Sequence, residues 1–410
     1  MNLSVKHLFL RQITGCRSPY LTYSQTSSVN ILMCSLKKFY GSFFWANKRN
    51  TGLEVHRSSF SEFLSTPVIV SGIHLANGVY VEQKRILVKN IYIKITLCSF
   101  VRCFSIGKGG AILIENTDID VTFTKASFVD CYAFKAGAFS VESSILIANQ
   151  CCIDRTSCSY LFPSFIYSSD LNSNSECVMN NTIIFGCGKN VERIGNILII
   201  HANESTCDSD NHTHNYCKYG SVLYRSVNNG KSLIQFCSFE KNNGSFGMIN
   251  SYHCSLLYKN AIFRSNKIEF ILFLNTRFYE STILIFSGCT FQNNTSTSKF
   301  TKTKNKQYLM VLESCYMEDD INDLINLNDS ILQKKSTIPF PIELIHEYQY
   351  CFSELPIKES IKSEMLNTII YIFLSLIFLL GSIYLIIYKY KNSQIISWMS
   401  NPGDKLLSND

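Results

Sequence analysis

One short stretch of the sequence gathers four side chains that could bind a metal ion. It reads CDSDNHTHNYC from Cys207 to Cys217, with His212 and His214 between the two cysteines. Two thiolates and two imidazoles suit tetrahedral Zn²⁺, although this spacing differs from that of the standard zinc fingers. A disulfide between Cys207 and Cys217, or a loop thrown out into solvent, explains the stretch without metal. We therefore predict no metal or cofactor and keep these four residues as weak candidates.

A second feature with chemical potential is the pair of carboxylates Asp118 and Asp120. Clusters of acidic residues carry acid–base chemistry in enzymes that cleave polysaccharides. Acidic residues are sparse around this pair, and a solvated turn accounts for it equally well. The sequence has no Walker A, kinase, G-x-S-x-G or H-E-x-x-H pattern. We predict a protein without catalytic activity and keep a polysaccharide-cleaving enzyme as the alternative.

Composition places the chain among folded proteins and locates its cysteines. Of the 410 residues, 46% are hydrophobic and 17% are charged, which is enough to bury a large core. The formal charge of +7 comes largely from the first 57 residues, so no basic nucleic-acid groove is predicted. All 17 cysteines lie between Cys16 and Cys351, before a hydrophobic stretch, and no C-x-x-C occurs. This asymmetry fits an oxidising, extracellular side for the cysteine-containing part.

The hydrophobic stretch near the C-terminus has the length of a membrane span. From Thr368 to Tyr388 the chain reads TIIYIFLSLIFLLGSIYLIIY, without a charged residue, and about 20 such residues cross a bilayer as a helix. Lys389 and Lys391 follow it, which favours a cytoplasmic C-terminus. The N-terminus shows no evident secretory signal, and its basic, acid-poor first residues also resemble an organelle transit segment. We predict a single-pass plasma-membrane protein, with a tail-anchored, cytosol-facing arrangement as an alternative.

Sequons for N-glycosylation accompany this prediction. N-x-S/T occurs before the predicted span and is the acceptor pattern in secreted chains. The candidate glycan acceptors are Asn180, Asn203, Asn211, Asn243, Asn293, Asn294 and Asn328.

Short phrases recur along the chain at a fixed period. CSFVRC, CSFEKN, AIFRSN and CTFQNN align on one aromatic or aliphatic column: Phe100, Phe128, Ile153, Ile184, Phe239, Phe263 and Phe291. Successive members are 24 to 31 residues apart, apart from one double step, and a small-residue column that includes Gly110 and Gly137 keeps the same period. Such a period is typical of solenoids, and the short apolar, β-rich segments between the columns favour strands over helices. The sequence thus predicts an all-β solenoid, a parallel β-helix.

Two further columns describe the inside of that solenoid. Asn242, Asn266 and Asn294 follow the aromatic column by three residues, so we expect them to stack as an amide ladder. The column two residues before the aromatic exchanges Cys with Ala, which indicates a small buried slot filled by stacked thiols in preference to disulfides. The repeat-defining residues are Phe100, Gly109, Gly110, Phe128, Gly137, Phe239, Asn242, Phe263, Asn266, Phe291 and Asn294.

The repeat phrases resemble those of a known family. GGAI at Gly109–Ile112, with FEKN, FRSN and FQNN, is similar to the GGA[ILV] and FxxN repeats of chlamydial polymorphic outer-membrane proteins and of trichomonad surface proteins. The resemblance covers roughly residues 68–296 and the C-terminal arrangement, although the chlamydial C-terminal barrel has no counterpart here. It implies a right-handed parallel β-helix ectodomain, followed by one transmembrane α-helix, that serves adhesion.

These observations give a domain plan and a function. We expect a basic N-terminal segment at 1–67, the β-helix at 68–297, a cap and stalk at 298–364, the transmembrane helix at 365–388 and a cytoplasmic tail at 389–410. The predicted function is adhesion or surface recognition, with an extracellular glycan or protein as partner, attachment to the membrane through residues 368–388, and no nucleic acid.

Overall fold

The computed structural model describes most of the first 318 residues and a few segments beyond them. The described residues are 3–13, 19–23, 27–46, 51–71, 92–115, 119–159, 164–167, 175–188, 197–217, 221–226, 231–252, 255–275, 282–296, 301–303, 308–318, 331–335, 339, 375 and 380–390.

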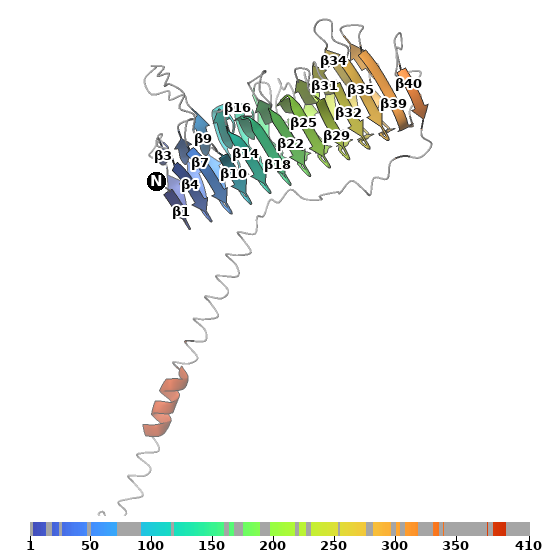
Figure 1. The fold of residues 1–410 in the computed structure, drawn as a ribbon. Coiled ribbons are helices and arrows are strands. Elements are labelled where there is room, and N and C mark those ends of the chain that lie inside the picture. Colours follow the sequence, from blue (N-terminus) through green and yellow to red (C-terminus); the bar gives the residue numbers. More distant parts are fainter. Residues whose placement is uncertain are drawn as a thin grey trace, which may run out of the picture. The chain divides into compact units, whose positions relative to one another are not determined.

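The chain divides into two units, residues 1–353 and 354–410. The first unit is an all-β solenoid in which the strands stack in chain order, from β1 to β40 (Figure 1). Each strand pairs in parallel with the equivalent strands one coil earlier and one coil later, as β10 does with β7 and β14. The predicted parallel β solenoid is therefore confirmed.

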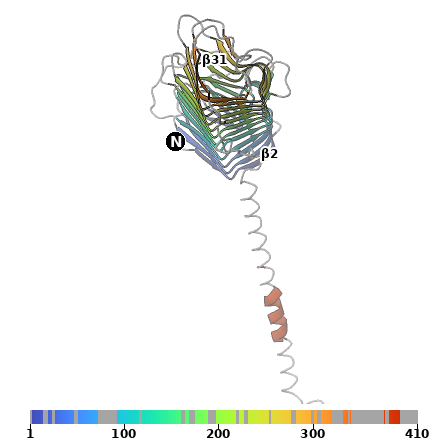
Figure 2. The same cartoon turned by 90° about the vertical axis from the view of Figure 1, so that its right-hand side faces the viewer.

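Four parallel sheets form the walls of this unit. Sheets A and B are continuous through β39, which pairs with strands of both, and together hold 24 strands. Figure 2 shows the sheets bending around a common interior. Sheet A contains β1 (Leu3–Lys6), β4 (Ser27–Leu32), β7 (Thr51–His56), β10 (Tyr92–Thr96), β14 (Asp120–Thr124), β18 (Ile145–Asn149), β22 (Glu176–Asn180), β25 (Glu204–Asp208), β29 (Lys231–Gln235), β32 (Ser255–Lys259), β35 (Thr282–Ser287), β39 (Tyr308–Met317) and β40 (Ile331–Lys335).

Sheets B, C and D complete each coil. Sheet B contains β2 (Phe9–Ile13), β5 (Ser35–Phe39), β8 (Ser59–Phe63), β11 (Ser99–Val101), β15 (Ser127–Val129), β19 (Cys152–Asp154), β23 (Ile183–Phe185), β26 (Asn211–Thr213), β30 (Ser238–Glu240), β33 (Ile262–Arg264) and β36 (Thr290–Gln292). Sheet C contains β3 (Leu21–Tyr23), β6 (Phe44–Ala46), β9 (Val68–Ser71), β13 (Ile112–Glu115), β17 (Phe139–Glu142), β21 (Ser164–Tyr167), β24 (Leu198–His201), β27 (Tyr216–Cys217), β28 (Ser221–Ser226), β31 (Asn243–Tyr252), β34 (Lys267–Asn275), β37 (Thr295–Ser296) and β38 (Thr301–Thr303). Sheet D contains β12 (Phe104–Lys108), β16 (Tyr132–Lys135) and β20 (Ser157–Cys158).

The aromatic column of the repeats runs along sheet B in strict register. Phe100 pairs with Phe128 on the next coil, and Phe239 pairs with Phe263 and then Phe291. The rings stack nearly parallel, with centroids 5.3 Å apart for Phe100 and Phe128 and 4.8 Å apart for Phe263 and Phe291. All five rings are buried, and each stacked pair adds about 1 kcal/mol beyond its area burial. The column predicted from the sequence is therefore the core of the solenoid.

Two corners with positive φ enclose every described strand of sheet B. The residue three before the aromatic column is left-handed in each coil, with φ between 47° and 63°, at His7, Met33, Arg57, Leu97, Lys125, Gln150, Asn181, Ser209, Phe236, Asn260, Gly288 and Ser314. The residue two after the column is left-handed as well, at Gln12, Lys38, Glu62, Arg102, Asp130, Arg155, Gly186, His214, Lys241, Ser265 and Asn293. A left-handed residue other than Gly costs roughly 1–2 kcal/mol. The chain bears this cost because each corner N–H continues the ladder, as Arg57 does to Thr96 O at 3.0 Å.

The solenoid begins earlier than the sequence pattern indicates. Strands β1 to β8 lie within residues 1–67, and Leu36 and Phe60 stand in register with Phe100. The N-terminal segment therefore consists largely of coils. The repeat is hidden there because the position of the later amide ladder holds apolar residues, Phe39 and Phe63, which stack at 4.7 Å.

The solenoid also extends beyond residue 297. Strand β39 pairs with β35 and β36, and β40 pairs with β39, so part of the expected cap and stalk continues the sheets. Phe291 is in register with Met317 there. Strand β38 pairs with β34 in the same range. The rest of 298–364, residues 318 and 339 apart, lies outside the described residues.

In the second unit the described residues 375 and 380–390 are helical. Within the described residues, no helix has both the length and the apolar character needed to cross a membrane. Most of the predicted span 368–388, and the tail beyond residue 390, lie outside the described residues.

The glycines of the GGAI phrase form a turn with no room for a side chain. Gly109 has φ +65°, and a Cβ on it would overlap the carbonyl oxygen of Ile112. A Cβ on Gly110 would overlap the carbonyl oxygen of Gly137, and one on Gly137 would overlap that of Ser157. The glycine column thus lets consecutive coils stack at backbone contact distance.

This packing predicts that replacing a glycine by alanine destabilises the fold far more at a coil contact than at an open position. We expect Gly137→Ala to lower the free energy of unfolding by about 2 kcal/mol, because the added methyl group must displace backbone of the next coil. Gly107→Ala is the matched control, since only Ser105 Oγ, at 3.8 Å, approaches its Cβ position. Urea unfolding followed by circular dichroism measures both, and equal midpoints for the two variants would contradict the stacking.

Candidate functional site

The four residues proposed for zinc do not meet in space. Cys207 is buried on β25 of sheet A and Cys217 is buried on β27. Both are reduced thiols. His212 points into the core from β26, whereas His214 stands at a left-handed corner. Among the described residues, no group of three or more His, Cys, Asp or Glu could hold a metal ion. The stretch is thus neither a zinc site nor a Cys207–Cys217 disulfide.

The same stretch is a regular coil, which corrects its interpretation as a loop. It forms β25, β26 and β27, and His212 pairs in register between Ile184 and Phe239. The imidazole stacks on the Phe239 ring at 4.7 Å with a 12° interplanar angle. Asn215 follows His212 by three residues, so HTHN is the missing copy of the FxxN phrase with His in place of Phe.

The amide ladder is confirmed and begins one coil before the predicted members. Asn242 Nδ2 donates to Asn266 Oδ1 at 3.1 Å, and Asn266 Nδ2 donates to Asn294 Oδ1 at 2.9 Å. Asn215 Nδ2 joins the ladder through Asn242 Oδ1 at 3.1 Å. Each amide also donates to a carbonyl of the preceding coil, as Asn266 does to Phe239 O at 2.7 Å.

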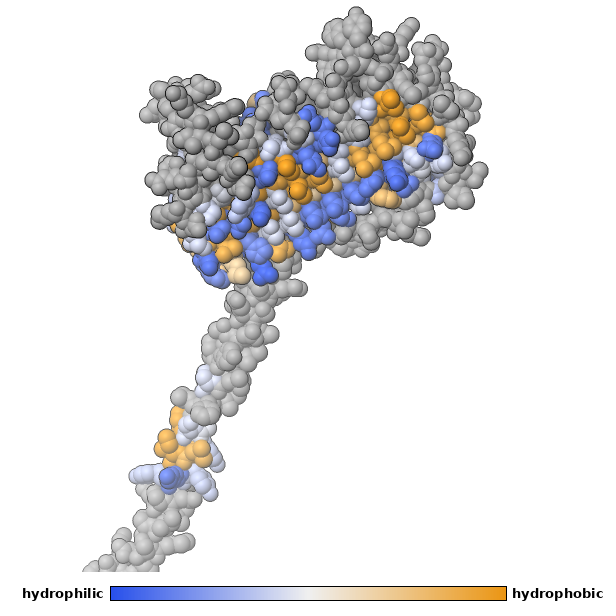
Figure 3. Space-filling view, in the orientation of Figure 1, coloured by the Kyte–Doolittle hydropathy of each residue, from blue (hydrophilic) through white to orange (hydrophobic). Residues whose placement is uncertain are grey.

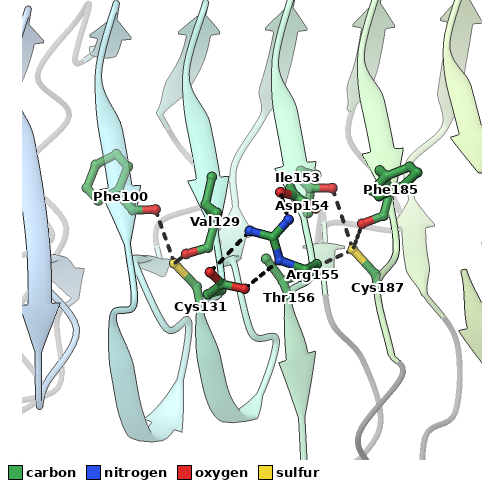
Figure 4. A network of polar contacts seen from close by, with 10 residues as sticks. Phe100, Val129, Cys131, Ile153, Asp154, Arg155, Thr156, Phe185 and Cys187 are labelled. Atoms are coloured by element: carbon green, nitrogen blue, oxygen red, sulfur yellow. Dashed lines mark hydrogen bonds and ion pairs between the residues drawn. The ribbon is translucent and has the colours of Figure 1, made fainter. Parts of the chain in front are cut away.

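Thiols take the place of these amides in earlier coils. Cys131 Sγ donates to Phe100 O at 3.4 Å, and Cys187 Sγ donates to Ile153 O at 3.5 Å (Figure 4). Both acceptors are carbonyls of the aromatic column, which are the groups that the asparagines cap further along. The cysteines of the two columns, Cys34, Cys98, Cys103, Cys131, Cys151, Cys187, Cys237, Cys289 and Cys315, are buried and outside disulfides, as expected.

Burial makes three of these thiols unreactive. Desolvation raises the pKa of Cys98, Cys151 and Cys187 to about 12, from an ordinary value of 9.0. The thiolate is the nucleophile and metal ligand, so thiols that stay protonated at neutral pH carry no such chemistry. The thiols of Cys98, Cys151 and Cys187 are therefore structural.

The carboxylates considered for catalysis do not form a constellation either. Asp120 is exposed at the start of β14 and accepts a hydrogen bond from Ser144 Oγ at 2.9 Å, while Asp118 lies outside the described residues. Asp130 and Arg155 stand at neighbouring corners and form a two-pronged ion pair at 2.8 and 3.2 Å (Figure 4). Such exposed pairs contribute about 0–1 kcal/mol to stability. We find no acid–base pair arranged for catalysis among the described residues.

The sequons fall into distinct structural settings. Asn243 and Asn293 are exposed, whereas Asn180, Asn203 and Asn211 are partly covered. Asn294 belongs to the amide ladder, and its Nδ2 donates to Phe263 O at 2.8 Å. A glycan on that nitrogen would break the ladder, so the exposed pair are the better acceptors. Asn328 lies outside the described residues.

The outer face of sheet A carries the most site-like surface of the described residues. Its strands point every second side chain outward, and the middle outward position is in register from coil to coil. We call its second half the apolar row: Ile147, Val178, Thr206, Leu233, Leu257, Ile285 and Val311.

The apolar row begins abruptly within the sheet. In the preceding coils the same position holds Asn30, Glu54, Lys94 and Thr122. Ile147 and Leu257 are each 37% exposed, and Ile283, beside the row on β35, is 41% exposed. Figure 3 shows hydrophobic side chains gathered on this face between bands of hydrophilic residues.

Polar residues border the row along one side. The position two residues further along each strand holds Asn149, Asn180, Asp208, Gln235 and Lys259 in register. Gln235 Nε2 donates to Asp208 Oδ2 at 2.7 Å. The result is a flat aliphatic strip with a hydrogen-bonding margin, the layout of a protein-interaction surface.

The sequence contains a signal for this strip that the repeat pattern masks. Strands that are buried on one face alternate apolar with polar residues, but ILIAN, SLLYK and TILIFS are apolar at consecutive positions. Continuous apolar runs suit a solenoid interior, so they do not by themselves reveal an exposed strip.

Comparison of the chain with models of known families, with curated proteins and with solved structures finds no match.

The buried thiols predict a loss of stability in alkali. Cys98 is neutral in the folded chain up to a pKa of about 12, whereas in the unfolded chain it ionises near 9.0. The stability it contributes is therefore complete below pH 9 and is lost as the pH rises from 9 to 12. Between pH 9 and pH 12 we expect one such thiol to lower the free energy of unfolding by about 1 kcal/mol per pH unit.

Cys98→Ala isolates this effect, because Ala126 fills the same slot one coil later. Urea midpoints at pH 8 and pH 10.5 should fall less in the variant than in the unmodified chain. The same decrease in both would show that Cys98 ionises equally in folded and unfolded states.

Proposed function

We propose that this protein is a membrane-attached recognition protein that binds a protein partner through the apolar row and performs no catalysis. The apolar row is the observation that carries the proposal. A solenoid presents equivalent side chains at regular intervals, and here one row is aliphatic in six of seven successive strands, with Thr206 as the exception. Nothing in the packing of the core requires these aliphatic residues, since their side chains point outward.

The chemistry of the row favours a protein over a glycan. Its members are aliphatic apart from Thr206, and the flanking positions offer amide, carboxylate and ammonium groups. Protein interfaces combine an apolar centre with a polar rim in this way. Sugars present polar edges and stack on aromatic rings, which the row does not supply.

Membrane attachment rests on the sequence. The uncharged stretch 368–388 has the length of a spanning helix, and the lysines after it favour a cytoplasmic tail. The similarity of the repeats to those of chlamydial and trichomonad surface proteins supports a right-handed β-helix outside the cell. In this arrangement the solenoid is the ectodomain and the apolar row faces the surroundings.

One observation favours a second candidate, a tail-anchored scaffold that faces the cytosol. Thirteen of the fourteen described cysteines are reduced thiols, whereas Cys152 is disulfide-bonded. Reduced thiols are the rule in that compartment. The apolar row would then bind a cytosolic protein. The two candidates differ in the side of the membrane on which the solenoid lies.

A single experiment on intact cells tests the proposal. Cells expressing the protein with a C-terminal tag are applied to arrays of purified extracellular matrix proteins and, in parallel, of glycans. We expect binding to protein spots, and external protease should remove both the binding and the solenoid while leaving a protected, tagged stub. Leu257→Glu should reduce binding at least tenfold, because it places a charge in the middle of the apolar row.

Thr122→Glu is the matched control, since it adds the same charge at the same position of the sheet but outside the row. Binding that survives Leu257→Glu, or that occurs on glycan spots alone, would contradict the proposed site. A protease-resistant, full-length protein on intact cells would contradict the proposed topology and support the cytosol-facing scaffold.

A further inference from the structure

Two pairs of cysteines occupy equivalent corner positions in consecutive coils. Cys103 and Cys131 both follow the aromatic column by three residues, and Tyr132 N–H donates to Cys103 O at 2.9 Å. Cys289 and Cys315 both precede it by two residues, and Tyr316 N–H donates to Cys289 O at 2.8 Å. All four thiols are buried, and each donates to a backbone carbonyl of the preceding coil, as Cys131 does to Phe100 O at 3.4 Å and Cys315 to Phe286 O at 3.3 Å.

The other column thiols among the described residues have different neighbours. Cys98 lies between Ser58 and Ala126 of the adjoining coils, and Cys237 between Asp210 and Ala261. Stacked thiols therefore occur in two places of the described columns, while the remaining cysteines are separated by at least one coil.

The spacing of these pairs suits a covalent bond. Equivalent residues of neighbouring parallel strands are about 4.8 Å apart. A disulfide joins residues whose Cα atoms are roughly 4.4–6.8 Å apart. Cys103, Cys131 and Cys289 lie between strands, where the backbone can adjust without breaking a ladder, whereas Cys315 lies within β39.

We propose that Cys103–Cys131 and Cys289–Cys315 are sites of inter-coil disulfide staples, formed with a small disulfide such as oxidised glutathione as the oxidant. One thiol of a pair, as thiolate, attacks a sulfur of the reagent and releases one glutathione thiol. The second thiol attacks the resulting mixed disulfide and releases the other. Two protein thiols are thereby oxidised to one disulfide, and one oxidised glutathione is reduced to two thiols.

The two staples should form at different rates. The hydrogen bond from Cys289 lowers the pKa of Cys315, and burial raises the pKa of Cys289, so Cys315 attacks first and Cys289 resolves. Burial raises the pKa of Cys103 well above its ordinary value. The Cys103–Cys131 pair therefore reacts more slowly, when its coils open or while the chain folds.

A staple links one coil to the next on the inner side, where the aromatic column already holds them. It restricts the unfolded chain while leaving the outer face of sheet A unchanged. The inference is independent of the proposed function, because it concerns the interior of the solenoid and not the apolar row.

The test uses the full chain in detergent, incubated with oxidised or reduced glutathione and digested for mass spectrometry. We expect linked peptides that contain Cys289 with Cys315, followed later by Cys103 with Cys131, each lighter by two hydrogens than the reduced pair. The urea midpoint should rise with oxidation and return after dithiothreitol. Cys98→Ala should leave both links intact.

Cys131→Thr and Cys315→Ala remove one staple each with replacements that the same columns hold elsewhere, Thr156 and Ala261. Each variant should lose its own link and part of the rise in midpoint. Three results would overturn the inference: no linked peptide under any oxidant concentration, stable glutathione adducts at these cysteines, or links to other cysteines in place of these pairs.

Discussion

The solenoid depends on how its left-handed corners satisfy their backbone hydrogen bonds. Each short strand of sheet B lies between two corners, where the chain turns out of the sheet and some polar groups leave the regular ladder. A side chain from the adjoining coil replaces the lost partner. Asn215 shows both halves of this exchange, since its Oδ1 accepts from Cys187 N at 3.0 Å and its Nδ2 donates to Ile184 O at 2.9 Å.

This constraint explains why the repeat keeps so few residues. From Cys103 onward the position holds a small side chain with a donor, and Cys, Asn and Thr all serve, as Cys131, Asn242 and Thr156 show in different coils of one column. The aromatic column needs only a flat or aliphatic group that stacks on its own kind, which His212 satisfies as well as phenylalanine. The outward-facing side chains are not constrained by the repeat. A recognition surface can therefore change along the solenoid without disturbing the core.

The structure could be predicted from the sequence at positions that require one residue type. It was mispredicted at positions where several residue types fit equally well. The aromatic column, the amide ladder and the buried thiols could be predicted, because their stacking is visible as a period. The coil at His212 was missed because an imidazole takes the place of the phenyl ring. The N-terminal coils were missed because Phe39 and Phe63 take the place of the amides. The corner residues, such as Leu97 and Phe236, carry no mark of their positive φ. The apolar row depends on which face each strand turns outward, which the register of the coils decides.

The central claim is that the backbone N–H just after a corner is held by a side chain of the next coil, as at Cys187, Asn215 and Asn242. Native-state amide hydrogen exchange tests this claim most directly. The Asn215 N–H is bonded to Asn242 Oδ1 at 3.0 Å and lies outside the strands, so it should exchange slowly. In Asn242→Ala its exchange should rise at least tenfold relative to the N–H groups within β29, with Gln235→Ala as a surface control. Fast exchange in the unmodified chain, or no change in the variant, would contradict the account.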